Sequence, residues 1–221
     1  MPYSRKASLA ALSADALSFT LRAFGTDVIV DPGTYDYFSF PAWRAYFRST
    51  RAHNTLVVDG LDQSVMLGPF LWGAPAPARC VLWEPSVDGD RVIGEHDGYR
   101  RLTDPVLHRR TLSLDPESRV LTIRDDIVAQ ANHDLAWYFH LAEDAAVSAG
   151  HPNRYRINVP GGTVMLEVDL RLAVDTLTGS EDPIGGWVSR GYHRKVPTTT
   201  LIARGRCDGD SSFVSRVNIG K

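Results

Sequence analysis

Leu17-Ser18-Phe19-Thr20-Leu21-Arg22-Ala23 alternates apolar and polar residues without interruption, and this stretch decides the fold class. A period of two places the apolar side chains on one face of an extended chain, which is the pattern of a half-buried β-strand. Asp27 to Asp31 is a second, β-branched run, and it closes at the turn dipeptide Pro32-Gly33. We therefore expect a buried set that includes Leu17, Phe19, Leu21, Val28 and Val30.

Short strand-like runs separated by turn signals continue along the chain. Residues 54–58 end at the hairpin dipeptide Asp59-Gly60, and residues 106–114 and 119–127 flank Asp115-Pro116. Similar runs cover residues 135–141, 155–159, 164–168, 198–203 and 213–219. This spacing predicts an all-β fold, a large antiparallel two-layer β-sandwich of more than a dozen short strands. Little helix is expected, and the best candidate is residues 42–47 after Pro41.

The composition excludes several classes of protein. Of 221 residues, 43% are hydrophobic and 23% charged, which is typical of a folded globular domain and not of a disordered chain. The formal charge of −2 gives no general attraction to nucleic acid. No run approaches the ~20 apolar residues that cross a bilayer, so we expect no membrane insertion. Cys80 and Cys207 leave a single disulfide open, because sequence does not decide pairing.

Asp31 and His53 stand at strand ends on either side of a loop rich in tyrosine and arginine. A carboxylate and an imidazole so placed can share a divalent metal, for which zinc is the natural candidate. The same two residues also have a purely structural interpretation. Asp31 then caps the Pro32-Gly33 turn, and His53 hydrogen-bonds locally. Spacing alone leaves both interpretations open.

The loop also holds candidate substrate-binding residues. Arg44, Arg48 and Arg51 suit the binding of sugar carboxylates, because a guanidinium donates two parallel hydrogen bonds. They can equally pair with Asp27, Asp36 or Asp62. Tyr35, Tyr37 and Tyr46 offer rings for sugar stacking or for ordinary packing. Structural roles are expected for His96, His108, His140 and His193.

Several motifs occur in one order along the chain. They are residues 15–19 (Asp-Ala-Leu-Ser-Phe), 31–35 (Asp-Pro-Gly-Thr-Tyr), 46–55 (Tyr-Phe-Arg-Ser-Thr-Arg-Ala-His-Asn-Thr) and 58–63 (Val-Asp-Gly-Leu-Asp-Gln). The pattern continues through residues 94–99, 108–110, 125–127, 139–141 and 186–190. Together they resemble the heparinase II/III-like polysaccharide lyase family, and in particular its C-terminal β-sandwich domain. The resemblance covers nearly the whole chain beyond about residue 15.

The resemblance implies a reaction and a partner domain. In the family an α/α-toroid domain precedes the sandwich, and an acidic glycan, such as a glycosaminoglycan, binds between the two. The reaction is β-elimination, in which a base removes the C5 proton of a uronic acid and an acid protonates the departing 4-oxygen. A tyrosine of the toroid usually takes part. The resemblance also implies a periplasmic or cell-envelope location, which the chain by itself does not reveal.

The resemblance fails at the first strand of the domain. The family's His-x-His-x-Asp segment aligns on Ala11-Leu12-Ser13-Ala14-Asp15, so Ala11 stands at the catalytic histidine and Ser13 at the metal-binding one. On a strand, residues 11, 13 and 15 share one face. A methyl group and a hydroxyl are neither a base near neutral pH nor a good zinc ligand. Asp31 and His53 match the remaining two metal ligands, which implies zinc that is held weakly or not at all.

Two domains of the sequence follow from this comparison. Residues 1–14 are an atypical segment that replaces the start of the family's strand, and residues 15–221 are the β-sandwich domain. We expect a module of a lyase that acts on uronic-acid-containing glycans and is inactive without its toroid domain, with no catalytic residue confirmed in this chain. The alternative is a non-catalytic carbohydrate-binding or structural accessory module.

Overall fold

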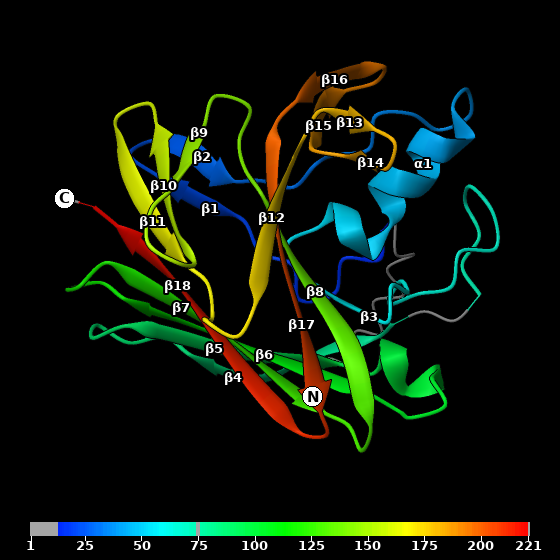
Figure 1. The fold of residues 1–221 in the computed structure, drawn as a ribbon, viewed down its shortest axis with the longest axis horizontal. Helices are drawn as coiled ribbons and strands as arrows, with labels where there is room; N and C mark the ends of the chain where they lie inside the picture. The colour runs from blue at the N-terminus through cyan, green and yellow to red at the C-terminus, as the bar shows by residue number, and fades with distance from the viewer. Residues whose placement is uncertain (1–12, 74–75, 221) are drawn as a thin grey trace, which may run out of the picture.

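The structure is a computed structural model, and it describes residues 13–73 and 76–220 (Figure 1). Two antiparallel sheets form its layers. The eight-stranded sheet has the order β4 (Ala78–Glu84), β5 (Asp90–His96), β6 (Leu107–Asp115), β7 (Val120–Val128), β18 (Ser211–Ile219), β11 (Gly162–Glu167), β10 (Arg154–Val159) and β9 (Ala146–Ala149). The four-stranded sheet has the order β12 (Ala173–Thr178), β17 (Thr199–Asp208), β8 (Asn132–His140) and β3 (Leu56–Val58).

Three short hairpins and three helical turns complete the described part of the chain. The hairpins pair β1 (Leu21–Ala23) with β2 (Thr26–Ile29), β13 (Ser180–Glu181) with β14 (Ile184–Gly185), and β15 (Trp187–Gly191) with β16 (Arg194–Pro197). The helices are α1 (Pro41–Arg48) and the 3-10 turns η1 (Thr50–Ala52) and η2 (Gly98–Arg101). The all-β prediction, with more than a dozen strands in two layers and little helix, is confirmed.

The hydrophobic core lies between the two sheets. Alternate residues of each strand point inward, as a pleated strand requires, and their side chains meet across the layers. Trp137 of β8 packs on Phe213 of β18 with ring centroids 4.8 Å apart. The other large, fully buried side chains from both layers include Leu56, Ile123, Ile127, Phe139, Ile157, Leu166 and Leu201.

Helix α1 carries the loop that precedes β3. Proline at its first position suits a helix start, because proline fixes φ and lacks an amide hydrogen that would be unpaired there in any case. The helix ends where Ser49 adopts an extended conformation (ψ 155°). The predicted helix over residues 42–47 is therefore confirmed, and the observed helix extends beyond it by a residue at each end.

The N-terminal strand is shorter than its sequence pattern predicts. Only Leu21–Ala23 forms a strand, and the amide of Ser18 closes a turn on the carbonyl of Asp15 (2.9 Å) with Leu17 at a φ of 61°. The expected strand over 17–23 is thus wrong for its first half. Leu17 and Leu21 are half-buried and were wrongly predicted as buried. Phe19, Val28 and Val30 are buried, as predicted.

Two smaller expectations also have outcomes. Cys80, on an exposed strand, and Cys207, in the core, are both free thiols, so they do not form the disulfide that the sequence left open. The longest described helix, α1, has 8 residues, and none in residues 13–73 and 76–220 is long and apolar enough to span a bilayer.

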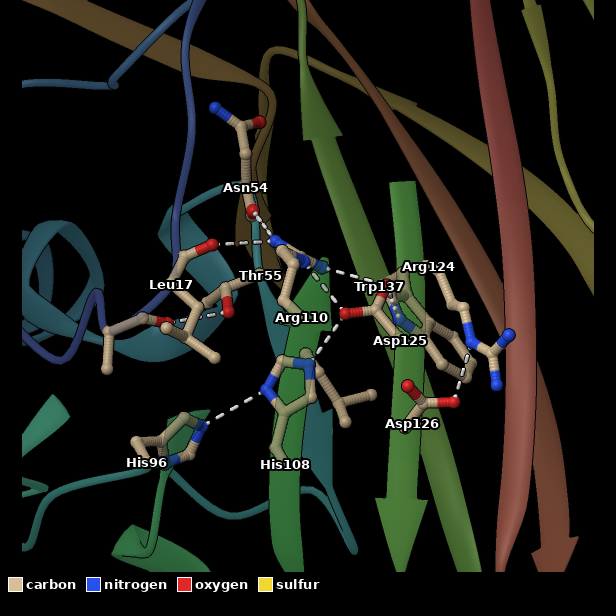
Figure 2. A network of polar contacts seen from close by, with 12 residues as sticks. Leu17, Asn54, Thr55, His96, His108, Arg110, Arg124, Asp125, Asp126 and Trp137 are labelled. Atoms are coloured by element: carbon tan, nitrogen blue, oxygen red, sulfur yellow. Dashed lines mark hydrogen bonds and ion pairs between the residues drawn. The ribbon is translucent and has the colours of Figure 1, made fainter. Parts of the chain in front are cut away.

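A buried ion pair joins the two sheets to the N-terminal segment (Figure 2). Asp125 of β7 accepts four hydrogen bonds: from His108 Nε2 (2.6 Å), from Arg110 Nε (2.7 Å) and Nη2 (3.1 Å), and from Trp137 Nε1 (3.0 Å) of the opposite sheet. Arg110 also donates to the carbonyls of Leu17 and Asn54 (2.8 and 2.7 Å). Burial by itself would raise the pKa of Asp125, but Arg110 and His108 hold that pKa far below its usual range.

The network fixes the protonation of two buried histidines. The Gly98 amide donates to His96 Nδ1 (3.2 Å), so the proton of His96 is on Nε2, which donates to His108 Nδ1 (3.2 Å). His108 then carries its own proton on Nε2, where Asp125 accepts it. Both rings are neutral, and burial lowers both pKa values. The expected structural role of His96 and His108 agrees with this arrangement.

Replacing Asp125 by asparagine tests how much depends on this carboxylate. Each of its oxygens receives two donors, so the amide group of the new side chain must point its own N–H bonds at two donors in either orientation. The change also leaves the charge of Arg110 uncompensated. We expect Asp125→Asn to lower the free energy of unfolding by about 3–5 kcal/mol.

The matched control is the next residue on the same strand. Asp126 pairs with Arg124 at the surface (2.9 Å), so Asp126→Asn should cost about 1 kcal/mol or less. Urea unfolding of the parent and both variants measures the difference. Equal losses in the two variants would contradict the assignment of Asp125 as the centre of the network.

Candidate functional site

Asp31 and His53 lie against each other at the edge of the sandwich. Asp31 follows β2, His53 follows η1, and Asp31 Oδ2 is 3.0 Å from His53 Nδ1. Asp31 Oδ1 accepts the Gly33 amide (2.8 Å), so the residue caps the turn and contacts the histidine at once. Burial alone would raise the pKa of Asp31, but the hydrogen bond and charge of His53 lower it overall. The two residues are therefore close enough to act together, as the sequence suggested.

Gly33 fixes the turn that presents Asp31. Its φ is +77°, and a Cβ at this position would lie 2.1 Å from the carbonyl oxygen of Ser189. Only glycine tolerates both the left-handed conformation and that close approach. The Ser189 amide in turn donates to the Pro32 carbonyl (2.7 Å), which ties the turn to β15.

Asn54 positions His53 by using every polar atom of its side chain. Its Nδ2 donates to the carbonyls of Phe19 (2.9 Å) and Val30 (2.8 Å), and its Oδ1 accepts the His140 amide (2.7 Å). Its own amide donates to Ser18 Oγ (3.0 Å). One buried side chain thus joins the N-terminal segment, the end of β2 and the end of β8 next to His53.

The described donors do not fit a tightly held zinc ion. A zinc site needs at least three protein ligands, and residues 13–73 and 76–220 contain no group of three His, Cys, Asp or Glu side chains arranged to hold a metal. His53 is 1% exposed, and its Nε2 is a buried atom with no hydrogen-bond partner among the described residues. Asp31 and His53 thus provide two side chains that can bind a metal. The Nε2 atom of His53 is the ring nitrogen that makes no hydrogen bond with Asp31.

The segment aligned with the family's histidines lies partly outside the described residues. Ala11 lies outside the described residues. Ser13 and Ala14 form a bend and not a strand, and the Ala14 amide donates to the Arg48 carbonyl (2.9 Å). The premise that residues 13 and 15 share one face of a strand is therefore wrong for this chain, because the segment turns to close over the end of α1.

The structure separates the three candidate arginines. Arg44 and Arg48 are 4% and 2% exposed, and they donate to the carbonyls of Pro69 (3.2 Å) and Gly68 (2.6 Å). Their guanidinium carbons also lie over the rings of Phe70 (5.2 Å) and Trp72 (4.2 Å) respectively. Both therefore hold the loop after β3 against α1. Arg51 is exposed, and its guanidinium lies over the ring of Tyr46 (5.5 Å).

The three carboxylates proposed as alternative partners have other contacts. Asp27 pairs with Arg22 and Arg190 at 3.1 and 3.2 Å. Buried Asp36 receives His193 Nε2 (2.6 Å), and Asp62 accepts the Thr50 amide (2.7 Å). The expected structural role of His193 agrees with its contact to Asp36.

The candidate tyrosines lie in different surroundings. Tyr35 is half-buried among aromatic rings, with Trp43 at 5.7 Å and Phe47 at 5.8 Å between centroids. Tyr37 is 40% exposed and stacks on Phe70 (6.2 Å). Tyr46 is 3% exposed, and its hydroxyl is buried with no hydrogen-bond partner among the described residues. Burial raises the pKa of Tyr46 above its usual range, although the charge of Arg51 opposes the shift.

His140 is buried and hydrogen-bonded, as the sequence suggested, but it lies on the outer face of the four-stranded sheet and not in the core between the sheets. Its Nδ1 pairs with Thr200 Oγ1 (2.9 Å) and its Nε2 with the Arg51 carbonyl (3.2 Å). Burial is the main cause that lowers its pKa to about 3, and the neighbouring charge of His53 adds to the effect. The ring is neutral at ordinary pH and supports the segment that carries Arg51.

A pocket of about 160 Å³ opens on the outer face of the four-stranded sheet. Tyr46 and Arg51 form one wall, and the strands β8, β12 and β17 form the floor. The sequence did not single out Tyr138 and Arg204, which also line it. Tyr138 was hidden because residues 135–139 are apolar throughout, so the inward and outward faces of β8 look alike in sequence. Arg204 lies in the second half of β17, beyond the strand expected at 198–203.

These observations define a β-sandwich module in which an exposed aspartate pairs with a buried histidine beside a pocket. Solved structures with this fold include the heparan sulfate lyase HepC from Pedobacter heparinus, with a TM-score of 0.76 and 20% identity over 94% of this chain. A heparinase III gene product gives a TM-score of 0.75 and 16% identity over 95% of the chain. This chain spans only 30% and 31% of the length of those two proteins. No curated protein sequence matches it significantly.

The family profile described as heparinase II/III-like, C-terminal, matches residues 2–216. This chain therefore belongs to the heparinase II/III-like C-terminal family, as the motifs indicated. The similarity to the solved structures supports the fold, and the family match extends over nearly the whole sequence.

We propose that Asp31 and His53 bind zinc weakly, because two protein donors leave most of the ion to solvent. Ser13→His should tighten zinc binding if residue 13 approaches this pair as the family alignment implies. Ala11→His should do so less, since that position aligns with a catalytic residue. Calorimetric titration of the parent and both variants with zinc measures the difference. Equal affinities in all three proteins would show either that the alignment of this segment is wrong or that Asp31 and His53 form no metal site.

Proposed function

We propose that this chain is the β-sandwich module of a polysaccharide lyase that acts by β-elimination on uronic-acid-containing glycans. The observation that carries this proposal is the family match over residues 2–216. HepC is a heparan sulfate lyase, which supports an acidic polysaccharide as the partner. The cell envelope is the location that we propose on the same family grounds.

The chemistry of β-elimination favours a module that needs further residues. A base near neutral pH and an acid must both reach the sugar, and together such groups contribute about 10²–10⁴-fold in rate. His96, His108 and His140 are buried with both ring nitrogens hydrogen-bonded, and His53 is buried with a hydrogen bond at Nδ1 alone. Burial opposes protonation of His133, but Asp59 (2.7 Å) and Asp104 (3.0 Å) hold its ring between them and raise its pKa overall. We propose that a toroid-type domain outside the present sequence supplies the missing groups.

The alternative is a non-catalytic carbohydrate-binding module. The pocket beside Tyr46 and exposed Arg51 favours it, because binding needs a shaped and charged surface but no acid or base. Both functions require that the chain bind an acidic glycan. They differ in whether that glycan is cleaved when the rest of a lyase is present.

The purified chain should release no unsaturated uronate from heparan sulfate, heparin, alginate or hyaluronan. The physical reason is that the residues aligned with the family's histidines are Ala11 and Ser13, which cannot remove a proton near neutral pH. The near-ultraviolet absorbance of the unsaturated product provides the measurement, with a heat-treated sample as the control. Turnover above that control in a preparation free of other lyases would mean that the chain carries its own base and acid.

Binding is the second half of the test. We expect the chain to be retarded by at least one of these acidic polysaccharides in affinity electrophoresis and not by a neutral glucan. Retardation should weaken as salt is added, because the contacts are between charges. Equal retardation by neutral and acidic glycans would contradict the proposed function. The absence of retardation by any of the acidic glycans would contradict it as well.

A further inference from the structure

The pocket on the four-stranded sheet combines features that the fold itself does not need. Strands β8, β12 and β17 provide its floor, and the β13–β14 hairpin and the segment after α1 provide its rim. A second, more open hollow of about 470 Å³ adjoins it, because both are lined by Tyr138 and Arg204. The first pocket is smaller than the roughly 300–1,000 Å³ of a drug-sized ligand site, so it suits one sugar ring at a time.

The hydroxyl of Tyr46 is the first unusual feature. It belongs to a residue that lines the pocket, it is buried, and it has no hydrogen-bond partner among the described residues. The backbone of Gly186, which also lines the pocket, lies near it but outside hydrogen-bond geometry. A buried hydroxyl without a partner lowers the stability of the folded state, whereas phenylalanine would fill the same space without that cost. Packing therefore does not account for the hydroxyl group.

The charge of Arg51 is the second unusual feature. Among the described residues it forms no ion pair within 4.0 Å, although the Asp62 carboxylate is near enough to feel its charge, and its guanidinium covers the face of the Tyr46 ring at 5.5 Å. If that guanidinium turns toward a ligand, it uncovers the ring beneath it. Across the pocket, Arg204 pairs with Asp175, and both are at the surface, where such a pair exchanges readily with another carboxylate.

The floor of the pocket offers a flat aromatic face. The ring of Tyr138 lies parallel to that of His140, with centroids 6.2 Å apart and an interplanar angle of 8°. The imidazole is held by Thr200 and the Arg51 carbonyl, so it cannot turn away. Tyr138 is half-buried, it lines both hollows, and it lies near enough to Arg51 and Arg204 for both charges to act on its hydroxyl.

We propose that this pocket binds one carboxylated sugar ring of the glycan, with the carboxylate between Arg51 and Arg204. The Tyr46 hydroxyl, which is inaccessible in the present arrangement, donates to the same ring once the groups that cover it move. The assignment rests on the proposed function, because it names where that acidic glycan binds. A carboxylate matches the planar donor pair of a guanidinium. Tyr138 provides the stacking face, and the adjoining hollow accommodates the next sugar along the chain.

Tyr46→Phe separates a binding role from a structural one. Removing a hydroxyl that lacks a partner should leave the melting temperature unchanged or raise it. The same change should weaken binding of a uronate oligosaccharide by about threefold to tenfold, which is the usual effect of one neutral hydrogen bond. A lower melting temperature together with unchanged affinity would show that the hydroxyl serves the fold, and would overturn its assignment.

Arg51→Gln should weaken binding of the uronate oligosaccharide by about tenfold or more, because a charged contact is lost. Arg156→Gln is the matched control. Arg156 is exposed on β10 of the other sheet, so its loss removes the same charge away from the pocket. Calorimetric titration with an alginate-derived oligosaccharide, a neutral glucan oligosaccharide and dextran sulfate compares carboxylate, neutral and sulfate ligands.

Each outcome decides between the pocket and the function. Selective binding of the uronate, lost in Arg51→Gln and kept in Arg156→Gln, supports the assignment. If the parent binds acidic glycans but Arg51→Gln and Tyr46→Phe bind as well as the parent, the pocket is wrong and the proposed function stands. Preference for dextran sulfate over the uronate overturns the carboxylate assignment. If the parent binds no acidic glycan at all, the proposed function itself fails.

Discussion

The carboxylate of Asp125 is the interaction on which the rest of the structure depends. It is buried in the eight-stranded sheet, yet it accepts a hydrogen bond from Trp137 of the other sheet (3.0 Å). Through Arg110 it also fixes the carbonyls of Leu17 and Asn54, which belong to segments with almost no strand pairing of their own. A buried charge is costly unless it is fully hydrogen-bonded, so the network specifies one arrangement of these segments. The candidate site stands on that arrangement.

Asn54 carries the constraint from the core to the surface. Its backbone carbonyl accepts a hydrogen bond from Arg110. Its side chain donates to the carbonyls of Phe19 and Val30 and accepts from the His140 amide. His53 comes just before it and Asp31 just after Val30, so their approach to 3.0 Å follows from a single buried amide. This explains how residues 22 positions apart in sequence meet without a regular sheet between them.

The sequence predicts the sandwich well and the N-terminal segment poorly, for a physical reason. Strands such as β7 and β10 alternate because one face is buried, and the alternation is visible in sequence. Residues 17–23 alternate too, but Ser18 and the carbonyl of Phe19 bond to Asn54 instead of to a neighbouring strand. Arg44 and Arg48 show a second limit. Composition suggests exposed cations, whereas carbonyls and rings from residues 68–72 enclose both side chains, and such long-range partners leave no local signal.

A few buried side-chain atoms lack a hydrogen-bond partner, and their positions are informative because most buried polar atoms near them are hydrogen-bonded. Among the described residues, the buried side-chain atoms without a hydrogen-bond partner are Tyr46 Oη, His53 Nε2 and Gln63 Oε1. The first two lie in one short segment, residues 46–53, which also carries the exposed cation of Arg51. By contrast, Asp125 accepts four hydrogen bonds, and every polar side-chain atom of Asn54 is hydrogen-bonded. Buried polar groups elsewhere in the fold are therefore paired. Of the three, only Tyr46 belongs to a residue that lines the pocket, so a ligand there accounts for its hydroxyl and not for the unpaired atoms of His53 and Gln63. That argument depends on the position of the Tyr46 hydroxyl and on the cost of leaving it unpaired, and it holds independently of family resemblance.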